Sequence, residues 1–169
     1  MPRLALLAVL ALLTGTTGCG LQPVYSGGSH GVAATSLHDI EVGPIAERAG
    51  YLVRGELKTR MGEPVDHPRY RLDITLDDQI LGFGIRGDNS VTRERRTLRA
   101  RYTLVEIATG AIVLDATATT DAGIDRVSSD FAVVAAENTA LERLSTDLAN
   151  QIVIRLARFA KEGGTGTAP

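Results

Sequence analysis

Three stretches of the chain alternate between apolar and polar residues with a period of two, over residues 69–77, 97–104 and 112–119. Because successive side chains of a strand point to opposite faces, each stretch predicts a β-strand with one buried and one solvent-facing side. Turn residues at 87–89 and 109–110 separate the stretches, which favours antiparallel hairpins. The residues predicted to face the core are Tyr70, Leu72, Ile74, Leu76, Leu98, Ala100, Tyr102, Leu104, Ile112, Leu114, Ala116 and Ala118.

Two other stretches repeat apolar residues at helical spacing. In the first, Pro44 is predicted to occupy the first helical position and Gly62 to end the helix. The second begins at Asp130, a good N-cap, and continues to about Lys161. At about 1.5 Å per residue the second helix is about 45 Å long, so we expect its end to project beyond a small sheet or the helix to kink. The apolar face of the first helix comprises Ile45, Ala49, Leu52, Val53, Leu57 and Met61.

A short additional strand is predicted at residues 37–42, before the first helix. The element order is then strand, helix, three strands and a long helix. This order predicts an α+β fold, a two-layer sandwich in which a four-stranded, mainly antiparallel sheet carries two helices on one face.

The N-terminus has the layout of a secretory signal peptide. Arg3 precedes an apolar run at 4–13, small residues follow at 14–18, and the only cysteine of the chain is Cys19. The apolar run is shorter than the roughly 20 residues that a membrane-spanning helix needs. The TTGC sequence at 16–19 resembles the lipobox of bacterial lipoproteins, with Thr16 where leucine is usual. We therefore predict that Cys19 is lipidated and anchors the exported chain through acyl chains, the alternative being an incidental thiol.

Composition divides the rest of the chain into a tether, a body and a tail. Residues 1–18 are the predicted signal peptide, and residues 19–36 are rich in glycine and serine, as expected of a flexible lipidated tether. Residues 37–161 contain all the predicted elements and form one domain. Residues 162–169 have the composition of a disordered tail.

Charge and motif content argue against several classes of function. The formal net charge is −2, which is unlike the strongly basic balance of most nucleic-acid-binding domains. The GFGIRG stretch at 82–87 has the spacing of a dinucleotide fingerprint, but a turn and a strand follow it, where that motif requires a helix. The histidines His30, His38 and His67 are scattered without other ligands nearby. We predict no catalytic residues, no cofactor and no metal site, hence no enzyme.

Arginines are concentrated around the second alternating stretch. Alternation places Arg93, Arg95, Arg99 and Arg101 on one face, pointing away from the helices. Guanidinium groups bind phosphates and carboxylates through two parallel hydrogen bonds, so this row suits an anionic lipid head group or an acidic protein wall. The alternative is a solvated face with ordinary ion pairs to Asp73, Asp77 or Asp115.

Four stretches after Cys19 carry a resemblance to known proteins. They are CGLQPVY at 19–25, IEVGPIAERAGYLVRGEL at 40–57, YRLDITL at 70–76 and RARYTLVEIATG at 99–110. Together they resemble the LptE family of lipopolysaccharide-assembly lipoproteins, and most closely its alphaproteobacterial branch, whose CGF-x-P-[LV]-Y opening is similar to the first stretch. The resemblance extends over nearly all of the chain after Cys19.

This resemblance implies a function as well as a fold. It implies a lipoprotein that is anchored in the outer membrane on the periplasmic side and plugs the LptD-type β-barrel that inserts lipopolysaccharide. Its other implied roles are support of barrel assembly and contact with lipopolysaccharide during transport to the cell surface. The four arginines would then contact lipopolysaccharide or the barrel. The alternative function is an auxiliary lipoprotein of an ABC-type lipid transport system, which is also small, tethered and noncatalytic.

Overall fold

The computed structural model describes residues 37–85 and 91–162. The predicted signal peptide, the tether with Cys19 and His30, and the tail from residue 163 onward lie outside these residues. The described elements are β1 (Ile40–Val42), α3 (Glu47–Met61), β2 (Tyr70–Ile85), β3 (Val91–Glu106), β4 (Ile112–Asp125) and α4 (Asp130–Lys161).

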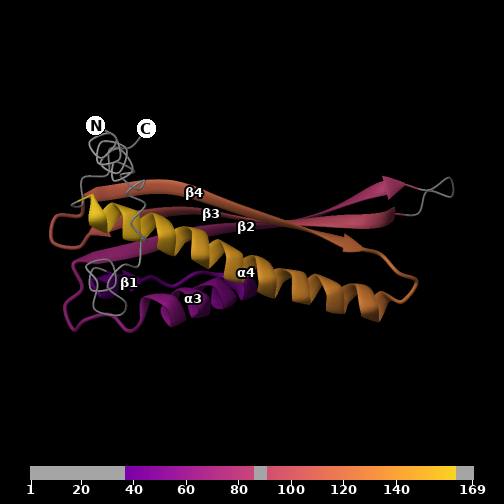
Figure 1. The fold of residues 1–169 in the computed structure, drawn as a ribbon, viewed down its shortest axis with the longest axis horizontal. Coiled ribbons are helices and arrows are strands. Elements are labelled where there is room, and N and C mark those ends of the chain that lie inside the picture. The colour runs from indigo at the N-terminus through magenta and orange to yellow at the C-terminus, as the bar shows by residue number, and fades with distance from the viewer. Residues whose placement is uncertain (1–36, 86–90, 163–169) are drawn as a thin grey trace, which may run out of the picture.

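The four strands form one sheet in the order β1-β2-β3-β4. The long strands β2, β3 and β4 pair antiparallel, while β1 pairs parallel with β2 because α3 carries the chain back across the sheet between them. Both helices lie against the same face of the sheet (Figure 1). The predicted α+β two-layer fold with a mainly antiparallel sheet is confirmed.

The core lies between this sheet face and the two helices. Leu72, Leu98 and Leu104 from the strands are completely buried. They meet a continuous apolar stripe of the helices, whose completely buried members are Val53, Leu57, Leu148, Ala149, Ile152, Leu156 and Ala157. Burial of each large aliphatic side chain contributes about 1.5–3 kcal/mol to folding, so this stripe sets which face of each element turns inward.

The long strands extend well beyond their predicted ends. β2 and β3 each have 16 residues, and at about 3.3 Å per residue each is about 53 Å long. The unbroken α4 has 32 residues and is about 48 Å long. The helix and the long strands are therefore matched in length. The expectation that α4 projects or kinks assumes a smaller sheet than the structure has.

Inward-facing polar residues explain why the sequence pattern ended before the strands did. Arg96 of β3 faces the helices and pairs with Asp78 of β2 at 2.5 Å, and it donates a second hydrogen bond to the backbone oxygen of Glu137 in α4 at 2.8 Å. Glu94, also on the helix-facing side, is buried and pairs with Arg126 at 2.9 Å. These pairs replace apolar contacts, so the strands continue without the alternation that predicts them.

Several predicted boundaries were wrong. β1 begins at Ile40 and not at residue 37. Helix α3 begins at Glu47, three residues after Pro44, while its predicted end at Gly62 is confirmed, with φ 79°. Ile112 is 62% exposed, because a register irregularity between Leu104 and Val105 pairs it with Val105 on the opposite face of the sheet.

Candidate functional site

The side of the sheet that carries no helix, which we call the helix-free face, contains the arginines singled out by the sequence. Arg93, Arg95, Arg99 and Arg101 occupy alternate positions of β3 and are all exposed. The side chains of Arg93, Arg95 and Arg101 retain 62%, 60% and 72% of their exposure. The intervening Leu98, Ala100 and Tyr102 are buried beneath the helices. The strand thus presents a row of guanidinium groups to the outside.

Aspartates of the edge strand β4 pair with three of these arginines. Arg93 pairs with Asp125 at 2.8 Å, Arg95 with Asp121 at 3.9 Å and Arg101 with Asp115 at 3.0 Å. The antiparallel register aligns the two rows, since Arg93 lies directly opposite Asp125 and Arg101 lies two positions from Asp115.

Hydrogen bonds across this ladder stabilise the charged forms of both partners. The bond from Arg101 lowers the pKa of Asp115, and the bond to Asp115 raises the pKa of Arg101. Hydrogen bonding to Asp125 likewise raises the pKa of Arg93. Of the aspartates expected to pair with the arginines, Asp115 does so, whereas Asp73 pairs with Arg71. The sequence did not indicate Asp121 and Asp125 as partners.

Arg99 differs from the other three arginines. Among the described residues it has no ion pair and no hydrogen bond, although Asp77 lies opposite it on β2. The Asp77 carboxylate instead accepts from the side-chain amide of Gln79 at 3.2 Å. Arg99 borders a shallow depression of about 420 Å³, which is also lined by Thr75, Asp77, Arg101, Asp115 and Thr117. The guanidinium of Arg99 is therefore free to bind an anionic group from outside.

Apolar side chains join the arginines near the β2–β3 hairpin. Leu81 and Phe83 are 63% and 40% exposed, and in the sheet register they lie opposite Arg95 and Arg93. The guanidinium carbon of Arg95 lies 5.6 Å from the centre of the Phe83 ring, a cation–π contact. This end of the helix-free face combines positive charge with exposed apolar surface. The neighbouring Gly82 and Gly84 lie inside strand β2, whereas a dinucleotide motif requires its glycines to form the turn that opens a helix.

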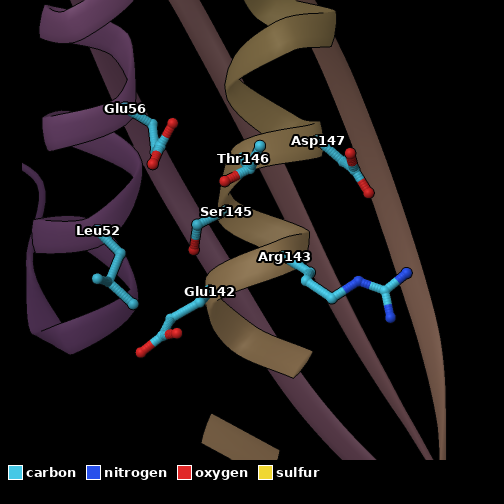
Figure 2. Close-up of a pocket in the computed structure, with 7 residues that line it drawn as sticks. All are labelled: Leu52, Glu56, Glu142, Arg143, Ser145, Thr146 and Asp147. Atoms are coloured by element: carbon cyan, nitrogen blue, oxygen red, sulfur yellow. The ribbon is translucent and has the colours of Figure 1, made fainter. Parts of the chain in front are cut away.

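A second hollow lies on the other side of the molecule, between the two helices. This α3–α4 groove has a volume of about 540 Å³ and is lined by Leu52, Glu56, Glu142, Arg143, Ser145, Thr146 and Asp147. Figure 2 shows Glu56, Glu142 and Ser145 directed into the gap between the helices, while Arg143 and Asp147 point away from it. Ser145 is completely buried, and its hydroxyl has no hydrogen-bond partner in the part of the chain that the structure describes. The sequence gives no signal for this groove, because its residues occupy ordinary positions of amphipathic helices.

Within residues 37–85 and 91–162, no cluster of three or more histidine, cysteine, aspartate or glutamate side chains has a geometry that would hold a metal ion. None of the helices in the same residues has both the length and the apolar character needed to cross a bilayer.

Comparison with known proteins identifies relatives of this fold. A family model described as lipopolysaccharide-assembly, LptE, matches residues 37–156, which include every strand, α3 and most of α4. No curated protein matches the chain.

Three solved structures are similar over most of their length. A candidate lipoprotein from Caulobacter crescentus aligns with a TM-score of 0.63 and 20% identity, over 76% of this chain and 96% of that one. The rare lipoprotein B from Shewanella oneidensis aligns with a TM-score of 0.58 and 10% identity, over 73% and 96% of the two chains. A lipoprotein B from Nitrosomonas europaea has a TM-score of 0.58 and 14% identity, over 73% and 83%. At these identities the likeness establishes a shared fold.

Proposed function

This chain belongs to the LptE family of lipopolysaccharide-assembly proteins, and we propose that it acts as the lipoprotein partner of an LptD-type outer-membrane β-barrel. The family acts in assembly and is not enzymatic, so the chain is not an enzyme. In the proposed role it is anchored through Cys19 on the periplasmic side of the outer membrane. Its folded body plugs the barrel, supports barrel assembly and contacts lipopolysaccharide during transport to the cell surface.

The observation that carries this proposal is the extent of the family match. The matched residues 37–156 contain the complete sheet and nearly the whole helical layer, so the resemblance does not rest on a short motif. The CGLQPVY run at 19–25 supports the lipid anchor independently of the folded body. That run and the stretches at 40–57, 70–76 and 99–110 also support membership of the alphaproteobacterial branch.

The helix-free face supports a contact with lipopolysaccharide or with the barrel wall. Lipopolysaccharide combines phosphate groups with acyl chains, and the hairpin end of this face combines Arg93 and Arg95 with Leu81 and Phe83. Since β4 aspartates already engage Arg93, Arg95 and Arg101, a phosphate or carboxylate ligand would compete with them, whereas Arg99 offers free donors. We therefore propose Arg99 as the principal anion contact, with Arg93, Arg95 and Arg101 as secondary contacts.

Purification of the full-length protein from outer membranes tests the proposed partnership. The tagged chain is extracted in a mild detergent, and its partners are identified and quantified by mass spectrometry. We expect a large outer-membrane β-barrel in a one-to-one ratio. Recovery of intact, membrane-bound protein without such a barrel would contradict the proposal, and copurification with inner-membrane transporter subunits would favour the auxiliary transport lipoprotein instead.

A further inference from the structure

We propose that the α3–α4 groove binds the side chain of an arginine or lysine from a partner protein, with Glu142 as the principal acceptor. The groove lies between the helices and therefore on the opposite side of the sheet from the arginine row. The proposal adds a second interaction surface to the one proposed above. It does not depend on the identity of the ligand of the helix-free face.

Two side-chain bridges between the helices frame this groove. Arg48 of α3 donates to Asn138 of α4 at 2.6 Å, and Arg60 of α3 donates to Asn150 of α4 at 2.5 Å. Both bridges join residues 90 positions apart, so the helices run in the same direction with a constant register. The same offset places Leu52 beside Glu142. Between these two bridges, the apolar Leu52 of α3 therefore lies beside the acidic Glu142 of α4.

The carboxylate of Glu142 is not paired with any basic side chain of the described residues. Among the described residues it has no ion pair and no hydrogen bond. Glu56, the other carboxylate directed into the gap, is already paired with Arg60. Arg143, the nearest basic residue in sequence, points away from the gap in Figure 2. The groove therefore offers a free carboxylate to a positively charged group.

Ser145 provides a second and independent indication of a ligand. Its side chain is completely buried and directed into the gap (Figure 2), and its hydroxyl has no partner within residues 37–85 and 91–162. A buried hydroxyl without a hydrogen bond costs about 1–3 kcal/mol, and so such groups normally have partners. An ammonium or guanidinium group that reaches the floor of the groove would supply a donor to this oxygen.

The lining favours a basic side chain over a metal ion. No cluster of potential metal ligands occurs among the described residues, so the acids here are too few or too far apart to coordinate an ion. Leu52 supplies an apolar wall along which the aliphatic part of a lysine or arginine packs while its charged end reaches Glu142. A groove of about 540 Å³ has room for one such side chain together with adjoining backbone.

Binding of a model peptide tests the site directly. The probe is a capped pentapeptide with one central arginine among glycines, and its control replaces arginine by the neutral isostere citrulline. Affinities are measured by titration against the full-length protein in detergent. We expect Glu142→Gln to weaken binding of the arginine peptide at least tenfold, whereas Asp66→Asn, which makes the same charge change at an exposed loop residue, should change it less than twofold.

Three results with the peptides and the acid substitutions would overturn the proposal. They are failure of the wild-type protein to bind the arginine peptide at millimolar concentration, equal binding of the citrulline peptide, and equal effects of the two acid substitutions. Displacement of the peptide by Mg²⁺ far beyond that by Na⁺ at matched ionic strength would make the groove a metal site and would also overturn it.

A second variant supplies the cation from the protein itself. Leu52→Arg places a guanidinium beside Glu142 in the same register as the bridges from Arg48 and Arg60. We expect this variant to lose peptide binding while its melting temperature stays the same or rises. Retention of full peptide affinity by a folded Leu52→Arg protein would contradict the proposal, even if Glu142→Gln were to behave as expected.

Discussion

A guanidinium group that already donates to a carboxylate offers less to an external anion than one whose donors are free. On β3, Arg93 and Arg101 form hydrogen-bonded pairs with aspartates of β4, whereas Arg99 has no such partner among the described residues. The alternation in the sequence places all four arginines on one face and does not distinguish one from another. Their difference arises from the register of β4 aspartates and from the bond between Gln79 and Asp77, which lies opposite Arg99, and the sequence specified neither.

Substitution of Arg99 tests its proposed role. Arg99→Ala should weaken binding of lipopolysaccharide, or copurification of the barrel, on the order of tenfold, because loss of a desolvated charge contact costs one to several kcal/mol. The melting temperature should hardly change, since the side chain is exposed and pairs with no other described residue. Binding assays and thermal unfolding of the full-length protein measure both effects.

Lys58→Ala, which removes the same charge from an exposed position of α3, is the matched control and should affect neither interaction. The double variant Arg99→Ala with Arg101→Ala separates the two ligands: loss of lipid binding alone would assign the row to lipopolysaccharide, and loss of the barrel alone would assign it to the barrel. Unchanged binding of both would show that the row is only a solvated surface.

Breaking the Arg96–Asp78 pair should destabilise the fold more than breaking one of the exposed pairs. The two side chains are 11% and 18% exposed, and Arg96 also holds a backbone oxygen of α4. Arg96→Ala leaves Asp78 largely buried and unpaired, so it should lower the free energy of unfolding by about 2–4 kcal/mol. Arg93→Ala breaks an exposed pair on the same strand and should cost less than about 1 kcal/mol. Equal losses in denaturant unfolding would contradict this view of the helix-facing pair.

At the scale of the strands and helices, hydrophobic periodicity predicted which side of each element faces the core. Alternation identified the core side of β2 and β3 through Leu72, Ile74, Leu98 and Leu104, because a one-residue shift would expose all of them. It failed at Ile112, where a register irregularity turns the residue to the other face. It also ended before the distal halves of β2 and β3, where charged pairs take the place of apolar residues on the inner side.

The α3–α4 groove could not be predicted because it depends on how two helices distant in sequence align. Each helix alone has an ordinary apolar face, and Leu52 belongs to it. Only the bridges between residues 90 positions apart reveal that Glu142 lies in a gap beside Leu52. The predicted start of α3 was also wrong: Pro44 suits a first helical position, but the helix begins three residues later at Glu47, whose φ is 66°.

Alanine substitutions at two glycines of α3 should change the stability in opposite directions, because one glycine is closely packed and the other is not. A Cβ at Gly50 would lie 2.6 Å from the backbone oxygen of Ile45, so Gly50→Ala requires the segment that enters the helix to move. We expect a loss of about 1–3 kcal/mol in the free energy of unfolding. A Cβ at Gly55 meets nothing within 4 Å, and Gly55→Ala should stabilise the helix by about 0.5–1 kcal/mol. Urea unfolding of both variants measures the two effects, and equal changes would refute the assigned packing.

At the scale of the whole molecule, the long sheet separates two surfaces of different chemistry. The helix-free face carries arginines with a row of aspartates beside them, and the opposite side carries the two helices with an acidic groove. Two separate proposed contact surfaces are consistent with the proposed role, in which the body lies inside a partner and also contacts a second ligand. Because β2, β3 and α4 are each about 50 Å long, the proposed contacts would be distributed along the length of the body.

The predicted anchor belongs to this scale as well, because it would determine where the whole body is held. Leu37, the first described residue, is only 3% exposed and belongs to the core, and the predicted tether lies between it and Cys19. A tether of 18 residues could extend to about 60 Å, which would let the body move well away from the membrane surface. We therefore expect that the proposed lipidation of Cys19 can be removed without disturbing the core.

Cys19→Ala tests the anchor. Two acyl chains give stable attachment to a membrane, so the variant should accumulate as an unprocessed precursor or appear in the soluble periplasmic fraction, while the melting temperature of its body stays unchanged. Intact-mass analysis of the mature wild-type chain should show an N-terminal Cys19 carrying acyl groups. Thr16→Leu is the matched control, because it introduces the residue usual at this lipobox position and should leave processing equal or more complete. A mature wild-type protein with an unmodified Cys19 thiol would contradict the anchor, whatever the membrane fraction contained, because a plug can also be retained there by its barrel.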